Sequence, residues 1–296
     1  MAVVRPPVLA GTWYPGRPAE LAALVDGLLA PGPHPPPAGR PLVAVVPHAG
    51  YAWSGPTAGR LYARLAGGLP GRVVILAPNH RVRLERIALS GADAFATPLG
   101  EVPVDTAAVA RLAACGAFAV DDRAHRDEHA VEIQLPFLQR LRPRDPPRIV
   151  PLLVPPLGAD LRRAAARALQ ELRDEDTLLL VSSDFTHYGE AYGYVPFRDD
   201  AARRLEQLDT GALLRILAGD GAGLRAYGRE TGITMCGLEA AALALDTGLP
   251  PGWEAALLDY ARSGDRDRDY TMSVSYAAVL LADGRAGPAG DDGGSR

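Results

Sequence analysis

Three apolar runs of this chain each end in side chains that bind metal ions or transfer protons. The run LVAVVP leads to His48, and the run RVVILAPN leads to His80. A third run, TLLLVSS, leads to Asp184 and, three residues later, to His187. Continuous aliphatic runs of this kind are typical of buried parallel strands. Because ligands of open α/β sheets bind beyond the carboxyl ends of the strands, we expect these side chains to meet in one crevice.

His48 and His80 are the first candidates for metal ligands. Neutral imidazole is the commonest protein ligand of transition metals, and two such nitrogens make most of a catalytic metal site. Each histidine alone could equally be a hydrogen-bonding residue of a turn. Their matching places after two neighbouring strands favour the metal site.

Cys236 is the third candidate. It precedes an apolar stretch through Leu245 that predicts a helix, so its thiol would lie at a helix N-terminus. The positive end of the helix dipole stabilises a thiolate, which is the form that binds metal or attacks a substrate. The alternative is a small buried residue packed under the helix.

The stretch SSDFTHYG, residues 182–189, combines Ser, Asp and His and could suggest a hydrolase. A Ser-His-Asp triad is assembled from distant segments, however, and the chain has no Gly-x-Ser-x-Gly elbow. We interpret His187 as a general acid/base beside the metal and Asp184 as a group that orients a ligand. For Asp184, capping of the turn is the simpler alternative.

His129 and Glu132 could hold the ligand imidazoles in the required tautomer. Asp127 is a suitable N-cap, so a helix is expected to start there, with His129 and Glu132 three residues apart on one face. The alternative is an ion pair on the surface of that helix.

Strand-like and helix-like segments alternate along the 296 residues, which predicts an α/β fold. We expect a single domain over residues 1–282, with a central mixed, largely parallel sheet flanked by helices. One helix is expected to begin at Ser54, and the Gly-rich residues 283–296 are predicted to be a disordered tail.

Composition restricts the classes of function. The net charge of −4 gives no support to nucleic-acid binding. No apolar run approaches the ~20 residues that span a bilayer, so no membrane role is expected. Two cysteines imply no disulfide framework and fit a reducing compartment. We therefore expect a cytoplasmic protein.

Several motifs together resemble the Memo-like family, whose prokaryotic members are labelled AmmeMemoRadiSam system protein B. In chain order from Arg5 to about Leu281 they are RPPVLAGTWYP, PHAGYAWSGPTAG, ILAPNHR, DEHAVEIQLPFL, VSSDFTHYG, TGITMCG and MSVSYAA. The resemblance implies a fold similar to the class III extradiol, non-haem iron dioxygenases. It also implies a metal site formed by His48, His80 and Cys236, with His187 in the place of the dioxygenase acid/base.

The resemblance also bears on chemistry and partners. Dioxygenases of that class use two histidines and a carboxylate, which suit Fe(II). A thiolate in the third position makes Cu(I) or zinc competitive with iron and puts ring cleavage in doubt. Animal members of the family look like redox or signalling proteins that bind phosphopeptides. Prokaryotic members accompany a radical SAM protein and an AMMECR1-like protein.

Two hypotheses follow. The first is a metal-dependent oxidoreductase that uses iron or copper, with zinc as a further candidate. The second is a non-catalytic module on a dioxygenase-like fold, which would bind a small molecule, a peptide or a partner protein.

Overall fold

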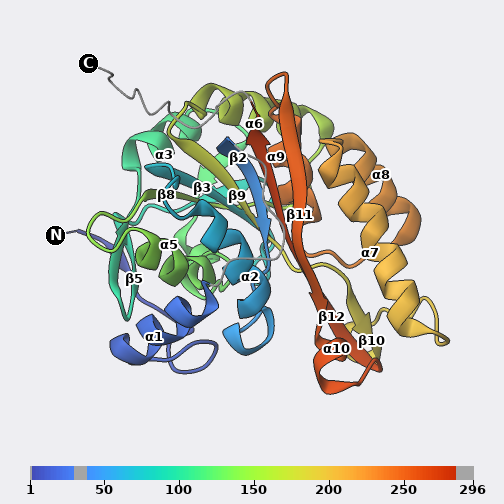
Figure 1. Ribbon diagram of the computed structural model, residues 1–296. Helices are drawn as coiled ribbons and strands as arrows, with labels where there is room; N and C mark the ends of the chain where they lie inside the picture. The colour runs from blue at the N-terminus through green and yellow to red at the C-terminus, as the bar shows by residue number, and fades with distance from the viewer. Residues whose placement is uncertain (1, 30–38, 285–296) are drawn as a thin grey trace, which may run out of the picture.

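The computed structural model describes residues 2–29 and 39–284 as a mixed α/β fold built on one large sheet (Figure 1). The strand order in this sheet is β10-β12-β2-β9-β3-β8-β4-β7, and β11 also pairs with β12. The bounds are β10 (His187–Gly189), β12 (Met272–Asp283), β2 (Arg40–Val46), β9 (Thr177–Ser182), β3 (Arg72–Ala77), β8 (Arg148–Leu153), β4 (Ile87–Leu89), β7 (Phe118–Val120) and β11 (Trp253–Arg262).

The centre of the large sheet is parallel, because β2, β9, β3 and β8 pair in the same direction. Every residue of β9 is buried, as are all but the first of β2 and β3. Both faces of these strands are therefore covered, which explains their continuous apolar runs. Strand β12 is antiparallel to β2 and to β11, so the sheet is mixed, as the sequence predicted.

A second, smaller sheet lies next to the first and has the order β1-β5-β6. Its strands are β1 (Val4–Arg5), β5 (Ala94–Thr97) and β6 (Gly100–Pro103). Strands β5 and β6 form an antiparallel hairpin, and β1 pairs with β5, which brings the N-terminal segment to this sheet.

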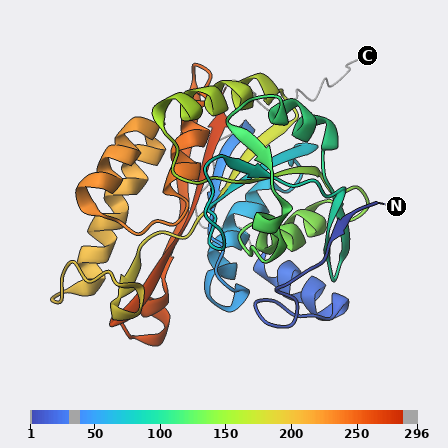
Figure 2. The ribbon, with the colours of Figure 1, turned by 180° about the vertical axis from the view of Figure 1, so that it is seen from behind.

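Helices cover both faces of the large sheet (Figures 1 and 2). Helix α2 packs on β2, β11 and β12 and contacts α1 and α5, whereas α9 packs on β2, β9 and β3 and contacts α6, α7 and α8. The helices are α1 (Pro18–Leu28), α2 (Tyr51–Leu65), α3 (Thr106–Ala113), α4 (Asp122–Arg126), α5 (Leu135–Leu141), α6 (Ala159–Leu172), α7 (Ala201–Leu217), α8 (Gly221–Thr231), α9 (Leu238–Asp246) and α10 (Ser263–Asp267), with 3-10 turns η1 (Glu132–Gln134) and η2 (Glu190–Tyr192).

Two helix starts differ from the sequence predictions. Helix α2 begins at Tyr51, because the hydroxyl of the buried Ser54 turns inward and donates to the carbonyl of Ala49 instead of capping the helix. No helix starts at Asp127, which is the residue after α4; Asp121 caps that helix.

The end of the chain is described as far as residue 284. Strand β12 extends to Asp283, one residue into the range in which we expected a tail. Residues 285–296 of that predicted tail lie outside the described part of the chain. Within the described residues, none of the helices combines the length and the apolar character that crossing a membrane requires.

Candidate metal centre

The candidate site lies at the carboxyl ends of three neighbouring parallel strands. Because β9 lies between β2 and β3, the residues that follow these strands meet at one edge of the sheet. His48 follows β2, His80 follows β3 and Asp184 follows β9, while His187 opens β10. These four side chains line one cavity of about 650 Å³.

The tautomer of His48 is fixed by a serine at the end of β9. The hydroxyl of Ser182 donates its only hydrogen to the carbonyl oxygen of Ala130, 2.6 Å away. Nδ1 of His48, 3.1 Å from Ser182 Oγ, must therefore be the donor in that contact. The lone pair of His48 is thus on Nε2, the nitrogen available to a metal ion.

His80 is held in the same tautomer by Glu128. Nδ1 of His80 lies 3.0 Å from one carboxylate oxygen of Glu128, and its backbone N–H donates to the other at 2.8 Å. Burial raises the pKa of this carboxyl, but its interactions with His80, first of all the hydrogen bond with the imidazole, outweigh burial and hold the pKa of Glu128 at about 2. An ionised carboxylate only accepts, so Nδ1 of His80 carries the hydrogen and Nε2 is free.

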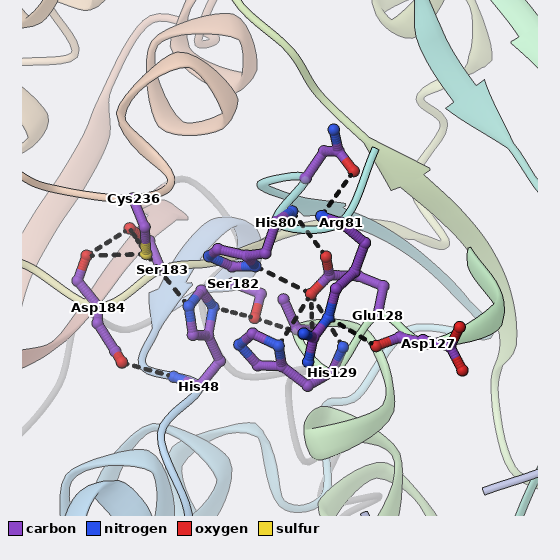
Figure 3. A network of polar contacts seen from close by, with 12 residues as sticks. His48, His80, Arg81, Asp127, Glu128, His129, Ser182, Ser183, Asp184 and Cys236 are labelled. Carbon is purple, nitrogen blue, oxygen red and sulfur yellow. Dashed lines mark hydrogen bonds and ion pairs between the residues drawn. The ribbon is translucent and has the colours of Figure 1, made fainter. Parts of the chain in front are cut away.

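His129 completes a cluster of three imidazoles (Figure 3). Its ring stacks on His80 with 4.5 Å between centroids and lies 5.2 Å from the ring of His48. One ring nitrogen from each of the three histidines lies within 4.8 Å of the others. Burial, together with the smaller effect of a positive charge on a neighbouring histidine, lowers the pKa of His48 and of His129 to about 3. Both rings are therefore neutral at pH 7, as metal binding requires.

The structure places Glu132 away from the imidazoles. Its buried carboxylate accepts from the backbone N–H groups of Val8 and Leu9 and from the hydroxyl of Tyr14, and it forms an ion pair with Arg5. These contacts tie the N-terminal segment to the body of the protein. Within the described residues, Glu132 forms no hydrogen bond or ion pair with an imidazole, and Glu128 takes the role that was predicted for it.

The geometry between residues 127 and 134 explains this difference. The segment forms a turn and then a single 3-10 turn, whereas the sequence prediction assumed one regular helix. His129 therefore points toward the cavity and Glu132 toward the N-terminal segment. Glu128 follows Asp127, the expected N-cap, and a glutamate in the first turn of a helix is ordinarily solvated, so the sequence gives no signal for its role.

Cys236 lies next to the ring of His48, on the side away from His129 (Figure 3). Its Sγ lies 3.1 Å from Nε2 of His48 and 3.5 Å from the carbonyl oxygen of Asp184. Helix α9 begins two residues later, close to the predicted start. Burial and the charge of Asp184 raise the pKa of the thiol, contrary to the thiolate that we expected. The contacts of the thiol with the Ser183 side chain and with the backbone of Asp184 and Gly237 lower its pKa but are weaker.

His187 presents a basic nitrogen to the same cavity. Its Nδ1 lies 3.1 Å from the carbonyl of Phe185 and 3.2 Å from that of Thr234. Carbonyl oxygens only accept, so Nδ1 carries the hydrogen and Nε2 can exchange a proton. The ring of Tyr192 lies against it, 5.2 Å away between centroids.

Asp184 binds backbone rather than an imidazole. One carboxylate oxygen accepts from the N–H of His48 at 2.8 Å, which fixes the turn that carries the ligand. Burial raises the pKa of Asp184. This is the turn-capping role that the sequence left open as the alternative.

These features define a class of protein: a mixed α/β domain in which imidazoles and a thiol meet at the carboxyl ends of parallel strands. The family described as "Memo-like protein" matches residues 5–280, and the chain belongs to this family.

Relatives of similar length support the assignment. The chain is 37% identical over 292 residues to a MEMO1 family protein of Thermococcus onnurineus, covering 94% of this chain and 99% of the relative. It is 34% identical over 280 residues to a MEMO1 family protein of Aquifex aeolicus, with 94% and 99% covered. The crystal structure of an uncharacterized protein from Escherichia coli K12 is similar in fold, with a TM-score of 0.50 at 15% identity. The match covers 82% of this chain and 100% of the Escherichia coli chain.

Proposed function

We propose that the protein is a metal-dependent oxidoreductase in which His48, His80 and Cys236 bind one iron or copper ion. The observation that carries the proposal is the arrangement of the two imidazoles. Each has Nδ1 committed to an acceptor, so that each offers Nε2, and the thiol lies 3.1 Å from one of these nitrogens. Two imidazoles and a soft sulfur ligand suit copper, zinc and iron.

Two residues, His129 and Cys236, are candidates for the third metal ligand. His129 belongs to the cluster of three imidazoles, but its Nδ1 makes no hydrogen bond although a carboxylate oxygen of Glu128 lies 3.1 Å away. Metal-binding imidazoles are usually oriented by such a bond. We therefore favour Cys236 as the ligand, with metal binding supplying the energy that deprotonates its thiol.

Proton transfer, positioning of the metal ligands and exclusion of water would be supplied by other residues of the cavity. A bound iron or copper would supply one-electron chemistry, with O₂ or an electron carrier as the co-reactant. His187 would accept or return a proton at Nε2, and Asp184 would hold the turn of His48 in place. Trp13, Trp53 and Tyr192 line the cavity and would shield a bound substrate from water.

Metal analysis of protein purified anaerobically without chelator tests the proposal. We expect near-stoichiometric iron or copper in the wild type, in His129→Gln and in the control Cys115→Ser, whose thiol lies outside the cavity. Folded His48→Ala and Cys236→Ser should lose the metal. Oxygen consumption by the loaded protein then tests the redox assignment.

Two results would contradict this proposal. Metal retained in Cys236→Ser but lost in His129→Gln would establish the three-histidine site instead. No metal in the wild type, even after reconstitution with Fe(II), Cu(I) and Zn(II), would remove the metal centre altogether.

A binding module is the second candidate, and the rim of the cavity favours it. Trp53 is 44% exposed, Tyr192 41% and Trp13 37%, and exposed aromatic side chains of this kind anchor peptides and partner proteins. We propose a radical SAM protein and an AMMECR1-like protein as cytoplasmic partners, on the basis of the family resemblance. Co-purification with these proteins by metal-free His48→Ala would support the module, and loss of the interaction in that variant would favour the enzyme.

A further inference from the structure

A second cavity, of about 620 Å³, reaches the candidate metal centre from the side of Cys236. Its walls come from the loop after β3, the segment after β8, helix α8 and the start of α9. Cys236 lines this cavity, whereas His48, His80 and His187 line the first one. The thiol therefore lies between two separate spaces.

The second cavity has an excess of positive charge. Arg83, Arg225 and Arg229 line it, against a single acidic side chain, Glu239. Within the described part of the chain, Arg83 and Arg229 form no hydrogen bond or ion pair, although the charge of Arg229 acts on Glu239. Burial raises the pKa of Glu239, and the charges of Arg225 and Arg229 act in the opposite direction.

Arg225 is a fixed, buried member of this group. It is only 7% exposed, and its Nη2 donates to Asp246 at 3.0 Å. Its Nη1 lies 2.9 Å from the same carboxylate but makes no hydrogen bond. This nitrogen is buried beside Asp246, so the Arg225–Asp246 pair forms part of the cavity wall, and Arg83 and Arg229 are the arginines that a ligand can reach.

The N-terminal end of helix α9 adds partial positive charge to the second cavity. Leu238 and Glu239, the first two residues of this helix, line the cavity. The first N–H groups of a helix have no partner within the helix and favour negative charge.

We propose that this cavity binds a small organic anion that carries a carboxylate or phosphate group. Arg83 and Arg229 bind the anionic group, and the rest of the ligand lies along the wall that contains Cys236. This rests on the proposed function in one respect: the thiol beside the anion is a metal ligand. The anion would then occupy a site distinct from the histidine-lined cavity.

Calorimetric titration of the full-length, metal-free protein with inorganic phosphate and with malonate tests the proposal. We expect one of the two probes to bind, and Arg83→Gln and Arg229→Gln each to weaken its affinity about tenfold, the effect of losing one charge-assisted hydrogen bond. The matched control is Arg167→Gln, which removes an exposed arginine outside the cavity and should leave the affinity unchanged.

Each outcome decides the question. Binding of phosphate alone identifies a phosphorylated ligand, and binding of malonate alone identifies a carboxylate. Failure of both probes, or binding that both cavity variants leave intact, overturns the proposal. The same titration on His48→Ala separates it from the metal centre, because anion binding should persist where metal binding is lost.

Discussion

At the scale of single residues, Ser182 decides which nitrogen of His48 carries hydrogen. Its hydroxyl donates to Ala130 and accepts from His48 Nδ1 and from the side-chain amide of Gln134. Ser182→Ala removes the group that selects the tautomer, so we expect metal affinity to fall about 10- to 100-fold. A competition titration with a metal chelator measures this affinity. Ser90→Ala, a buried serine bonded to Asp122, is the control; equal affinity in both variants would contradict the role of Ser182.

Two neighbouring glutamates provide a sharper comparison. Glu128→Gln keeps the shape of the side chain but removes the charge that orients His80, and we expect metal affinity to fall about 10- to 100-fold. Glu132→Gln breaks a buried ion pair with Arg5 and should cost about 3–5 kcal/mol of unfolding free energy. The folded fraction of Glu132→Gln should bind metal normally. Denaturant titrations together with the chelator assay distinguish the two effects, and the reverse pattern would refute the assignment.

At the scale of elements, the start of α9 must lie very close to the end of β9. A Cβ atom on Gly237 would be 2.5 Å from the Cβ of Ser183 and 3.0 Å from the carbonyl oxygen of Ser182. Gly237→Ala therefore has to displace the helix start together with Cys236. We expect the variant to fold with lower stability and to lose metal affinity, as measured by thermal unfolding and chelator competition. Gly116→Ala, where an added Cβ meets no atom within 4 Å, should change neither quantity.

The strands were predictable because their signal is local. Residues 42–46, 73–77 and 178–181 are continuous aliphatic runs, and their burial on both faces of the sheet is what such runs indicate. Helix α8, in contrast, was not predicted. Its sequence GAGLRAYGRET contains three glycines and few apolar residues, and it is held by packing on α7 and α9, which no local pattern reports.

The same reasoning applies to the candidate site. His48, His80, Asp184 and His187 could be placed together from strand ends alone. That Glu128, and not Glu132, contacts an imidazole could not be predicted, because it depends on an irregular turn. The pKa of Cys236 could not either, since burial of the thiol outweighs the helix N-terminus, and burial is a property of the whole fold.

At the scale of the whole molecule, buried histidines make stability depend on pH. His125 lies apart from the metal centre, and burial lowers its pKa to about 4 from an ordinary value of about 6.5. Between these values the unfolded chain binds a proton that the folded protein does not. The contribution of the neutral, buried His125 to the free energy of unfolding is therefore fully present above about pH 6.5 and is lost as the pH falls toward 4. The pKa values of His48 and His129 shift in the same direction.

Denaturant unfolding of the metal-free protein between pH 7.5 and pH 4.5 tests this dependence. Each buried histidine contributes up to about 1.4 kcal/mol per pH unit. His125→Gln should reduce the dependence of the unfolding free energy on pH by the contribution of one histidine. Glutamine can donate to the carbonyl of Ala88, as His125 does, but it does not titrate. An unchanged slope in this variant would show that His125 is not one of the groups responsible.

The position of β2 at the centre of the sheet has a consequence for synthesis of the protein. This strand is made early, yet its two neighbours are β9 and β12, which leave the ribosome much later. Until Ser182 and Cys236 have both been translated, His48 lies at the end of an unpaired strand and lacks its contacts with these two residues. An ion that needs all of these residues can be acquired only by a nearly finished chain, so metal supply would act after translation rather than during it.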